Sequence, residues 1–275
     1  MTDRYAVVGH PVAHSLSPEI HAAFARQTGQ AIDYIRLQAP LGEFAATVLK
    51  FRAQGGRGVN VTVPFKHDAW SLAEVRADDA ADARAVNTLV FRDGKITGHN
   101  TDGIGLITDI EANLAFPIRQ KRVLLMGAGG ATYGVTQPLL RAQPARLVVV
   151  NRTLAKAQIL VAHFLKVAQR ERVPFSAQSY EEPAGAQFDL VINATSAGLT
   201  DKMPPLERGI FAAGALAYDM VYGRQTPFMQ FARQEGATIA DGLGMLVEQA
   251  AAAFFIWRGV RPDTAPVIEK FKSRN

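Results

Sequence analysis

The sequence of 275 residues contains no cysteine. This absence excludes disulfide bonds, thiolate metal ligands and a cysteine nucleophile, and it fits a reducing compartment, so we expect a cytoplasmic protein. The six histidines are scattered, and no spacing of the H-E-x-x-H type is present. Because this spacing is typical of zinc sites on a helix, we expect no metal site.

Long apolar runs and clusters of charge are also missing. The most apolar late stretch, Met245 to Trp257, carries Glu248 and is too short to span a bilayer, and the N-terminus does not resemble a signal peptide. The net charge is +5, but the basic residues are dispersed and no aromatic residues interleave with them. This pattern favours a small anionic ligand over a nucleic acid or a membrane. We expect a monomer or a homodimer.

Short β-rich runs alternate with amphipathic segments along the N-terminal third, which predicts parallel strands joined by helices. The strands are expected at Tyr5–Gly9, Asp33–Leu37 and Gly58–Val63, and the helices near Ser17–Thr28 and Leu41–Gln54. Asp93-Gly94 then separates two alternating runs, which predicts an antiparallel hairpin.

A second series of the same kind follows a helix expected from Gly103 to about Leu114. Its strands are expected in "RVLLMGAGG", which runs into a glycine-rich turn, and in "RLVVVNRT", "FDLVINATS" and "ALAYDMVY". The last helix, about Gly244 to Trp257, has too few partners to form a domain and is expected to pack on the first series. The predicted fold is therefore α/β with two domains, residues 1–101 plus 241–275 with a mainly parallel sheet, and residues 102–240, with a cleft between them.

Glycines crowd the turn after the first strand of the second series, at Gly127, Gly129 and Gly130. Glycines there let backbone N–H groups approach a pyrophosphate at a helix N-terminus, as in Rossmann folds. The spacing departs from G-x-G-x-x-G because Thr132 is the sixth residue, so a tight turn that binds nothing is the alternative.

The next strand ends in Asn151, Arg152 and Thr153, with Lys156 one turn later. Rossmann folds that bind NAD usually carry an acidic residue at this strand end, and a carboxylate would repel the 2′-phosphate of NADP. The missing acid and the two cations favour NADP. An ordinary helix cap followed by solvated cations is the alternative.

Two further positions indicate proton transfer. Lys66 follows a strand, and Asp102 follows the hairpin. An ammonium can stabilise the negative charge that develops on a carbonyl oxygen during reduction and then donate a proton, while a carboxylate holds it in place. Spacing alone leaves open that both are surface charges.

The stretch "GHPVAHSLSPEIHAAF" places Ser15 and Ser17 just before a predicted helix. Ser17 precedes Pro18 and is expected to cap that helix. A cap needs one hydroxyl, so two hydroxyls at a helix N-terminus also predict a clamp for a carboxylate.

Taken together, these motifs resemble the shikimate dehydrogenase family over nearly the whole chain. The matching segments, in the family's order, are "SLSP" from Ser15, "NVTVPFK" from Asn60, "AVNT" from Ala85, "GHNTDG" from Gly98, "GAGGA" from Gly127, "NRT" from Asn151, "INATSAG" from Ile192 and "DGLGMLVEQAA" from Asp241.

The resemblance implies an NADP-dependent oxidoreductase that interconverts 3-dehydroshikimate and shikimate, with Lys66 and Asp102 as the catalytic pair. It also implies that residues 1–101 plus 241–275 bind substrate and that residues 102–240 form a Rossmann-like NADP-binding domain. The implied substrate ligands are Ser15, Ser17, Asn60, Thr62, Asn87, Tyr222 and Gln249. The implied cofactor ligands are Asp78, Gly127, Ala128, Gly129, Gly130, Ala131, Asn151, Arg152, Thr153, Lys156, Thr195, Met220, Gly242 and Met245.

Two departures bear on the cofactor. Tyr133 and Lys156 stand where many family members carry arginine. An NAD-preferring quinate/shikimate dehydrogenase is one alternative, although it is expected to have an acid in place of Asn151. A nucleotide-binding module without catalysis is another, although Lys66 and Asp102 are both present.

Overall fold

The computed structural model describes residues 2–182, 185–195 and 203–273. It divides into two compact units, which are described separately. The N-terminal unit comprises Met1–Gly105 and Leu246–Lys270, and the second unit comprises Leu106–Met245 and Phe271–Asn275. No helix in the described part of the chain is both long and apolar enough to cross a membrane.

The N-terminal unit is built on a six-stranded sheet with the order β2-β1-β3-β5-β6-β4. β1, β2 and β3 are mutually parallel, β5 runs antiparallel to β3 and to β6, and β4 is parallel to β6. Asp93 and Gly94 both have positive φ between β5 and β6, as a tight hairpin turn requires, so the predicted hairpin is confirmed. The strands are β1 Asp3–Gly9, β2 Ile32–Gln38, β3 Gly56–Val61, β4 Val75–Arg76, β5 Thr88–Arg92 and β6 Lys95–His99.

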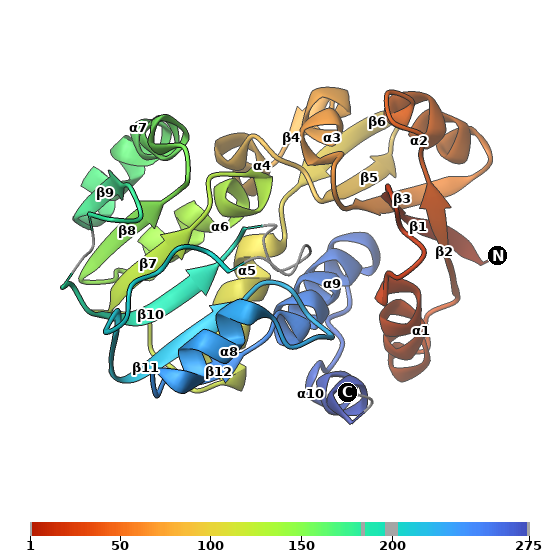
Figure 1. Cartoon of the computed structure of the whole chain (residues 1–275). Coiled ribbons are helices and arrows are strands. Elements are labelled where there is room, and N and C mark those ends of the chain that lie inside the picture. The colour runs from red at the N-terminus through yellow and green to blue at the C-terminus, as the bar shows by residue number, and fades with distance from the viewer. Residues whose placement is uncertain (1, 183–184, 196–202, 274–275) are drawn as a thin grey trace. The chain divides into compact units, whose positions relative to one another are not determined.

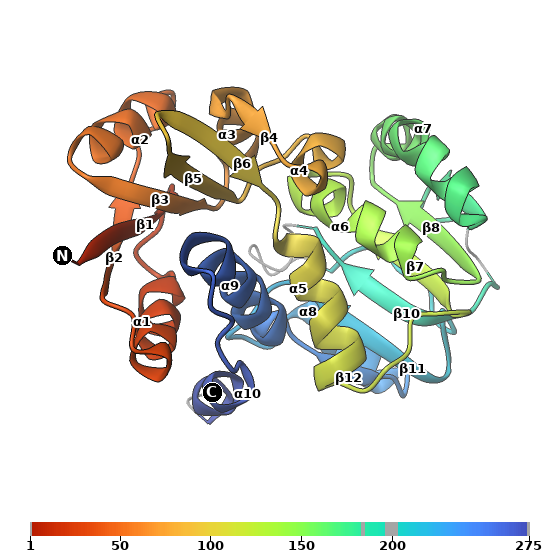
Figure 2. The same ribbon diagram turned by 180° about the vertical axis from the view of Figure 1, so that it is seen from behind.

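Helices cover both faces of this sheet (Figure 1; Figure 2). Successive strand residues point to opposite faces, so Val59 and Val61 pack with Phe44 of α2 on one face, whereas Tyr5 packs with Trp257 of α9 on the other. The last long helix therefore packs on the N-terminal sheet, as its lack of partners predicted. The helices are α1 Ser17–Thr28, α2 Phe44–Ala53, α3 Lys66–Leu72, α4 Asp78–Ala83, α9 Leu243–Arg258 and α10 Ala265–Lys272.

The second unit is built on a six-stranded, all-parallel sheet with the order β12-β11-β10-β7-β8-β9. Leu125 of β7 packs with the helices α6 and α7, and its neighbour Leu124 packs with α8 on the opposite face. The strands are β7 Arg122–Met126, β8 Arg146–Val150, β9 Phe175–Gln178, β10 Phe188–Asn193, β11 Phe211–Asp219 and β12 Thr238–Ala240. The helices are α6 Gly130–Arg141, α7 Leu154–Glu171 and α8 Pro227–Gln234.

The helix expected from Gly103 to about Leu114 is present, with a change of helix type along it. α5 covers only Asp102–Thr108, and a π-helical turn, Asp109–Asn113, follows it. The buried Asp109 accepts a hydrogen bond of 2.6 Å from the Tyr218 hydroxyl. This partner comes from β11, so local periodicity carried no sign of it.

Candidate active site

Lys66 and Asp102 form an ion pair in the N-terminal unit. Lys66 is the first residue of α3 and Asp102 is the first residue of α5, so both side chains start at helix N-termini just after strand ends. The Lys66 side chain is 17% exposed and the Asp102 side chain 7%. Such a pair, largely shielded from water but reachable, can hold an ammonium where a carbonyl oxygen could be bound. The alternative that these residues are isolated surface charges is wrong.

Asn87 joins this pair to a more distant helix. Its side-chain nitrogen lies 2.8 Å from Asp102 Oδ1, 2.9 Å from Thr101 Oγ1 and 3.2 Å from Gln249 Oε1, and its two hydrogens are shared among these three acceptors. Its Oδ1 accepts from the Thr101 backbone N–H at 2.8 Å, which fixes the orientation of the amide. The structure thus brings together Lys66, Asp102, Asn87 and Gln249 from four segments of the sequence.

The two serines of the predicted clamp face each other. Ser15 Oγ donates to Ser17 Oγ at 3.1 Å, and the Ser17 N–H donates to Ser15 Oγ at 3.3 Å. The expected cap by Ser17 is wrong, because the N-cap residue is Leu16, which makes no side-chain cap, and Ser17 is the first helical residue. Both hydroxyls remain beside the start of the helix, where the dipole favours an anion.

Asn60 and Thr62 lie at and just beyond the end of β3. The backbone N–H of Thr62 donates to Val8 O at 2.9 Å, so the chain still follows β1 at this point. Asn60 is 5% exposed, and its Oδ1 accepts a hydrogen bond of 2.7 Å from the hydroxyl of Tyr34. Asn60 is therefore held by protein contacts on its inner side.

The glycine-rich turn of the second unit fits a pyrophosphate. Gly127 has φ of 111°, and a Cβ there would lie 3.2 Å from both Ala194 O and Thr132 Oγ1, so only glycine suits this position. Gly129, the N-cap residue of α6, has open space beside it, and no side chain caps the helix. Thr132 Oγ1 is buried without a hydrogen-bond partner in the described part of the chain. Ala128 and Ala131 complete this turn.

The segment after β8 is open to solvent. Arg152, Thr153 and Lys156 are exposed, and none of them forms a salt bridge within the described residues. Asn151 is half-buried, and its amide donates to Thr153 O at 2.9 Å. Thr153 is the N-cap residue of α7, but its side chain accepts no hydrogen bond from the first turn of that helix. The alternative that this residue serves only as a helix cap is therefore not supported by a side-chain hydrogen bond. These polar groups can bind a phosphate.

Three residues expected near the nicotinamide are linked through neighbouring loops of the second unit. Thr195 Oγ1 donates to Asn193 Oδ1 at 2.7 Å, and the Met220 N–H donates to Asn193 O at 3.0 Å. The Gly242 N–H donates to Val221 O at 3.1 Å. Met245 is buried in the core of the unit. Residues 196–198 of the "INATSAG" motif lie outside the described residues.

Two predicted ligands belong to a different unit from the rest of their set. Tyr222 follows β11 in the second unit, and Asp78 is an exposed residue at the start of α4 in the N-terminal unit. No group of three or more histidines, aspartates or glutamates able to hold a metal occurs among the described residues.

Comparison with known proteins identifies the family. Residues 7–89 match the shikimate dehydrogenase substrate binding domain, residues 110–200 match shikimate / quinate 5-dehydrogenase, and residues 242–270 match the shikimate 5′-dehydrogenase C-terminal domain. A shikimate dehydrogenase (NADP(+)) of Methylobacillus flagellatus is 58% identical over 272 residues, which cover 98% of this chain and 99% of that protein. The chain belongs to the shikimate dehydrogenase family.

Solved structures agree with this assignment. An Ael1 enzyme from Pseudomonas putida superimposes with a TM-score of 0.90 and 48% identity, covering 98% of each chain. A shikimate 5-dehydrogenase from Thermus thermophilus, in complex with NADP(H) and shikimate, gives a TM-score of 0.85 and 32% identity, again covering 98% of each chain. The two-domain α/β fold of the shikimate dehydrogenases, with a Rossmann-like domain, is thereby confirmed for this chain.

The sequence motifs did not predict several side chains that contact the predicted ligands. Tyr34 contacts Asn60, Thr88 lies between Asn60 and Asn87, and Arg36 donates two hydrogen bonds to Ser15 O, at 2.6 and 3.0 Å. Thr88 is the last residue of the "AVNT" motif, so that motif could have indicated it. Tyr34 and Arg36 belong to an ordinary strand pattern, which gave no indication of either.

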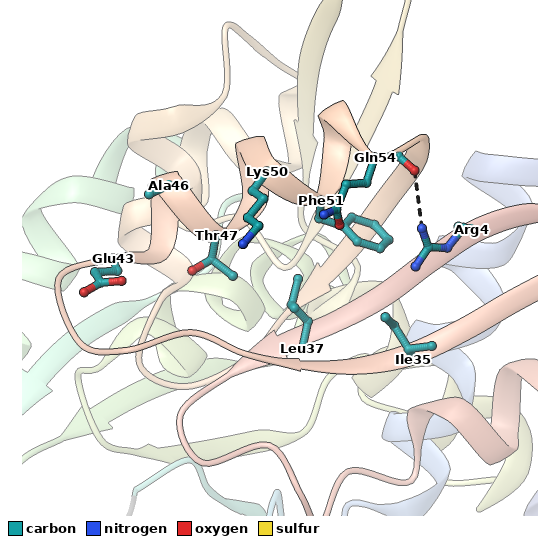
Figure 3. Close-up of a pocket in the computed structure, with 9 residues that line it drawn as sticks. All are labelled: Arg4, Ile35, Leu37, Glu43, Ala46, Thr47, Lys50, Phe51 and Gln54. Carbon is teal, nitrogen blue, oxygen red and sulfur yellow. Dashed lines mark hydrogen bonds between the residues drawn. The ribbon is translucent and has the colours of Figure 1, made fainter.

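A hollow of about 440 Å3 lies between α2 and β2 (Figure 3). Leu37 and Phe51 form apolar parts of its wall, and Lys50 and Glu43 provide charge. None of the predicted site residues lines it. We therefore assign the hollow no part in the shikimate dehydrogenase site.

Proposed function

We propose that the protein catalyses the reversible, NADPH-dependent reduction of 3-dehydroshikimate to shikimate, a step in the route to aromatic amino acids. The observation that carries this proposal is the ion pair of Lys66 and Asp102, with Asn87 hydrogen-bonded to the same carboxylate. The pair belongs to a chain of the shikimate dehydrogenase family and supplies the acid–base chemistry that such a reduction needs.

Lys66 acts on the carbonyl oxygen of the substrate. NADPH, when bound, supplies the hydride. As negative charge develops on the oxygen, the Lys66 ammonium stabilises it and then donates a proton to form the alcohol. Asp102 accepts hydrogen bonds from both Lys66 and Asn87, and so holds the ammonium in place. In the opposite direction, the Lys66 nitrogen receives the proton of the shikimate hydroxyl.

The remaining substrate contacts come from hydrogen-bonding side chains. Ser15 and Ser17 donate to the substrate carboxylate without neutralising its charge, which suits a ligand that must also leave. The substrate hydroxyls are bound by Asn60, Thr62, Asn87 and Gln249, with Tyr222 as a further ligand. Apart from Tyr222, these residues belong to the N-terminal unit.

NADP is bound chiefly by the second unit. The residues that would hold the pyrophosphate are Gly127, Ala128, Gly129, Gly130 and Ala131, and Gly129 has open space beside it. Asn151, Arg152, Thr153 and Lys156 bind the 2′-phosphate and adenosine. The nicotinamide half is flanked by Thr195, Met220, Gly242 and Met245, and Asp78 contributes from α4.

The setting of the reaction follows from composition. We propose a cytoplasmic enzyme, because a chain without cysteine fits a reducing compartment. It acts as a monomer or a homodimer and has no nucleic-acid partner, because its basic residues are dispersed along the sequence. Light scattering during size-exclusion chromatography measures the oligomeric state.

Steady-state kinetics on the purified protein test this function. Shikimate and quinate are each paired with NADP⁺ and with NAD⁺, and formation of the reduced cofactor is followed by absorbance. Shikimate with NADP⁺ is expected to give by far the highest kcat/KM. Equal efficiency with NAD⁺ would refute the cofactor assignment, and a preference for quinate would refute the substrate assignment.

A further inference from the structure

A series of buried hydrogen bonds leads from β2 to the carboxylate of Asp102, all within the N-terminal unit. The Tyr34 hydroxyl donates to Asn60 Oδ1 at 2.7 Å, and Asn60 Nδ2 donates to Thr88 Oγ1 at 3.0 Å. The Thr88 hydroxyl donates to Asn87 Oδ1 at 3.0 Å, and Asn87 Nδ2 donates to Asp102 Oδ1 at 2.8 Å. We call this series the Tyr34–Asp102 relay.

The direction of every bond in the relay follows from its Asn87 end. The Thr101 backbone N–H can only donate, and it donates to Asn87 Oδ1, so Asn87 Nδ2 faces Asp102. Thr88 therefore donates to Asn87 Oδ1 and accepts from Asn60 Nδ2, which leaves Asn60 Oδ1 to accept from Tyr34. All the donors therefore point toward the negative charge of Asp102, an arrangement in which neighbouring hydrogen bonds polarise and strengthen one another.

Burial and packing limit the partners that these groups can reach. Thr88 is fully buried, Asn87 is 2% exposed, and Asn60 and Thr88 are direct partners across the antiparallel pair β3 and β5. The Tyr34 ring stacks on the His21 ring with their centroids 4.2 Å apart. Burial also raises the pKa of Tyr34 well above its usual value, so the hydroxyl keeps its proton and remains a donor.

We propose that Tyr34 and Thr88 are positioning residues for the acid–base pair. Through the relay they hold the Asn87 amide and the Asp102 carboxylate in the orientation that keeps the Lys66 ammonium in place for proton transfer. This role rests on the proposed function of Lys66. Tyr34 and Thr88 are not themselves proposed substrate ligands, whereas the relay passes through Asn60 and Asn87, which are.

The experiment compares Thr88→Val, which removes the hydroxyl at nearly constant volume, with Thr88→Ser, which retains it. Thr88→Val is expected to lower kcat for shikimate oxidation about 10-fold with a smaller change in KM, because a misplaced catalytic group costs the transition state more than the ground state. Thr88→Ser is expected to stay within about 2-fold of the wild type. Thr97→Val is the matched control, a threonine of β6 that takes no part in the relay.

Two combinations separate positioning from a general structural effect. Tyr34→Phe with Thr88→Val is expected to lose no more kcat than the worse single variant, because both interrupt one relay. In a Lys66→Ala background, Thr88→Val is expected to leave the residual kcat unchanged, because it acts through Lys66. Thermal melts monitored by circular dichroism verify that each variant is folded, and Tyr34→Phe serves alone if Thr88→Val does not fold.

The possible failures are distinguishable. Absence of shikimate turnover by the wild type would overturn the proposed function and this role with it. If the wild type turns over shikimate normally, two outcomes would overturn the positioning role alone. One is an unchanged kcat in both Thr88→Val and Tyr34→Phe, and the other is a loss of kcat in Thr97→Val equal to that in Thr88→Val. A further loss of kcat caused by Thr88→Val in the Lys66→Ala background would also overturn it.

Discussion

The side-chain amide of Asn87 donates a hydrogen bond of 2.8 Å to the Asp102 carboxylate, on the oxygen that Lys66 leaves free. The two oxygens of Asp102 thus have separate partners, one an ammonium and the other an amide. This arrangement gives the ammonium one defined position, because the carboxylate cannot rotate without losing a charge-assisted hydrogen bond. The division of roles between Lys66 and the substrate ligands can be tested by substitution.

Lys66→Ala is expected to lower kcat for shikimate oxidation about 100-fold or more, because the group that transfers the proton is lost. Calorimetry is expected to show nearly unchanged binding of shikimate. Lys50→Ala, at an exposed position of α2, is the control and should behave as the wild type. Lost binding combined with an intact kcat would make Lys66 a binding residue.

Ser15→Ala and Ser17→Ala are each expected to raise KM for shikimate about 10-fold, because a hydrogen bond to a charged carboxylate is lost. The thermal stability of Ser17→Ala should change little, since Ser17 is not the N-cap residue of α1. Ser71→Ala, an exposed serine of α3, is the control. If Ser17→Ala instead cost about 1 kcal/mol of stability and left KM unchanged, the helix-cap interpretation would be restored.

Asn151→Asp is expected to reduce the preference for NADP⁺ over NAD⁺, measured as the ratio of the two kcat/KM values, by about 10-fold or more. The new carboxylate repels a 2′-phosphate and can accept hydrogen bonds from a 2′-hydroxyl. Asn151→Ala removes the amide without adding charge and should change the ratio less. An unchanged ratio in Asn151→Asp would place the 2′-phosphate elsewhere.

Gly244→Ala is expected to destabilise the fold by about 1 to 3 kcal/mol, measured by urea denaturation. A Cβ at this position would collide with the carboxylate of Asp109, which is buried and bonded to Tyr218. Helix propensity alone predicts the opposite sign, because alanine is favoured over glycine by about 1 kcal/mol within a helix. A stabilised variant would therefore show that Asp109 gives way.

His21 is expected to make the fold sensitive to acid. Burial lowers its pKa from 6.5 to about 3, with a smaller opposing effect of Asn60, so the folded state keeps the ring neutral while the unfolded chain takes up a proton. Stability is therefore expected to fall as the pH drops below about 6.5, by about 1.4 kcal/mol per unit at most, and to level off near pH 3.

Urea denaturation between about pH 4 and pH 7 tests this dependence. His21→Leu should show a shallower loss of stability with acid than the wild type. His14→Gln, which alters an exposed histidine, is the control and should keep the wild-type slope. Equal slopes in the wild type and in His21→Leu would contradict the expectation.

The sequence predicted the helices and strands whose formation depends on residues close together in the chain. Asp93-Gly94 specified the hairpin because a tight turn needs positive φ, and the alternating strands of both units had the expected apolar character. The short helices α3 and α4 and the strand β9 were not predicted, because their few residues carry too little periodicity. The π-helical turn at Asp109–Asn113 was not predicted either, and the partner of Asp109 there, Tyr218, lies 109 positions later on β11.

The sequence by itself determined the βαβ order, the glycine turn and the residue types available for proton transfer and anion binding, since each depends on neighbours along the chain. Only the tertiary structure decided how they meet. It brought Gln249 to Asn87, 162 positions earlier, stacked the Tyr34 ring on the His21 ring, and buried Thr88 between Asn60 and Asn87. These contacts arise from packing across strands and helices, where burial makes an unsatisfied polar group costly and so selects one set of partners.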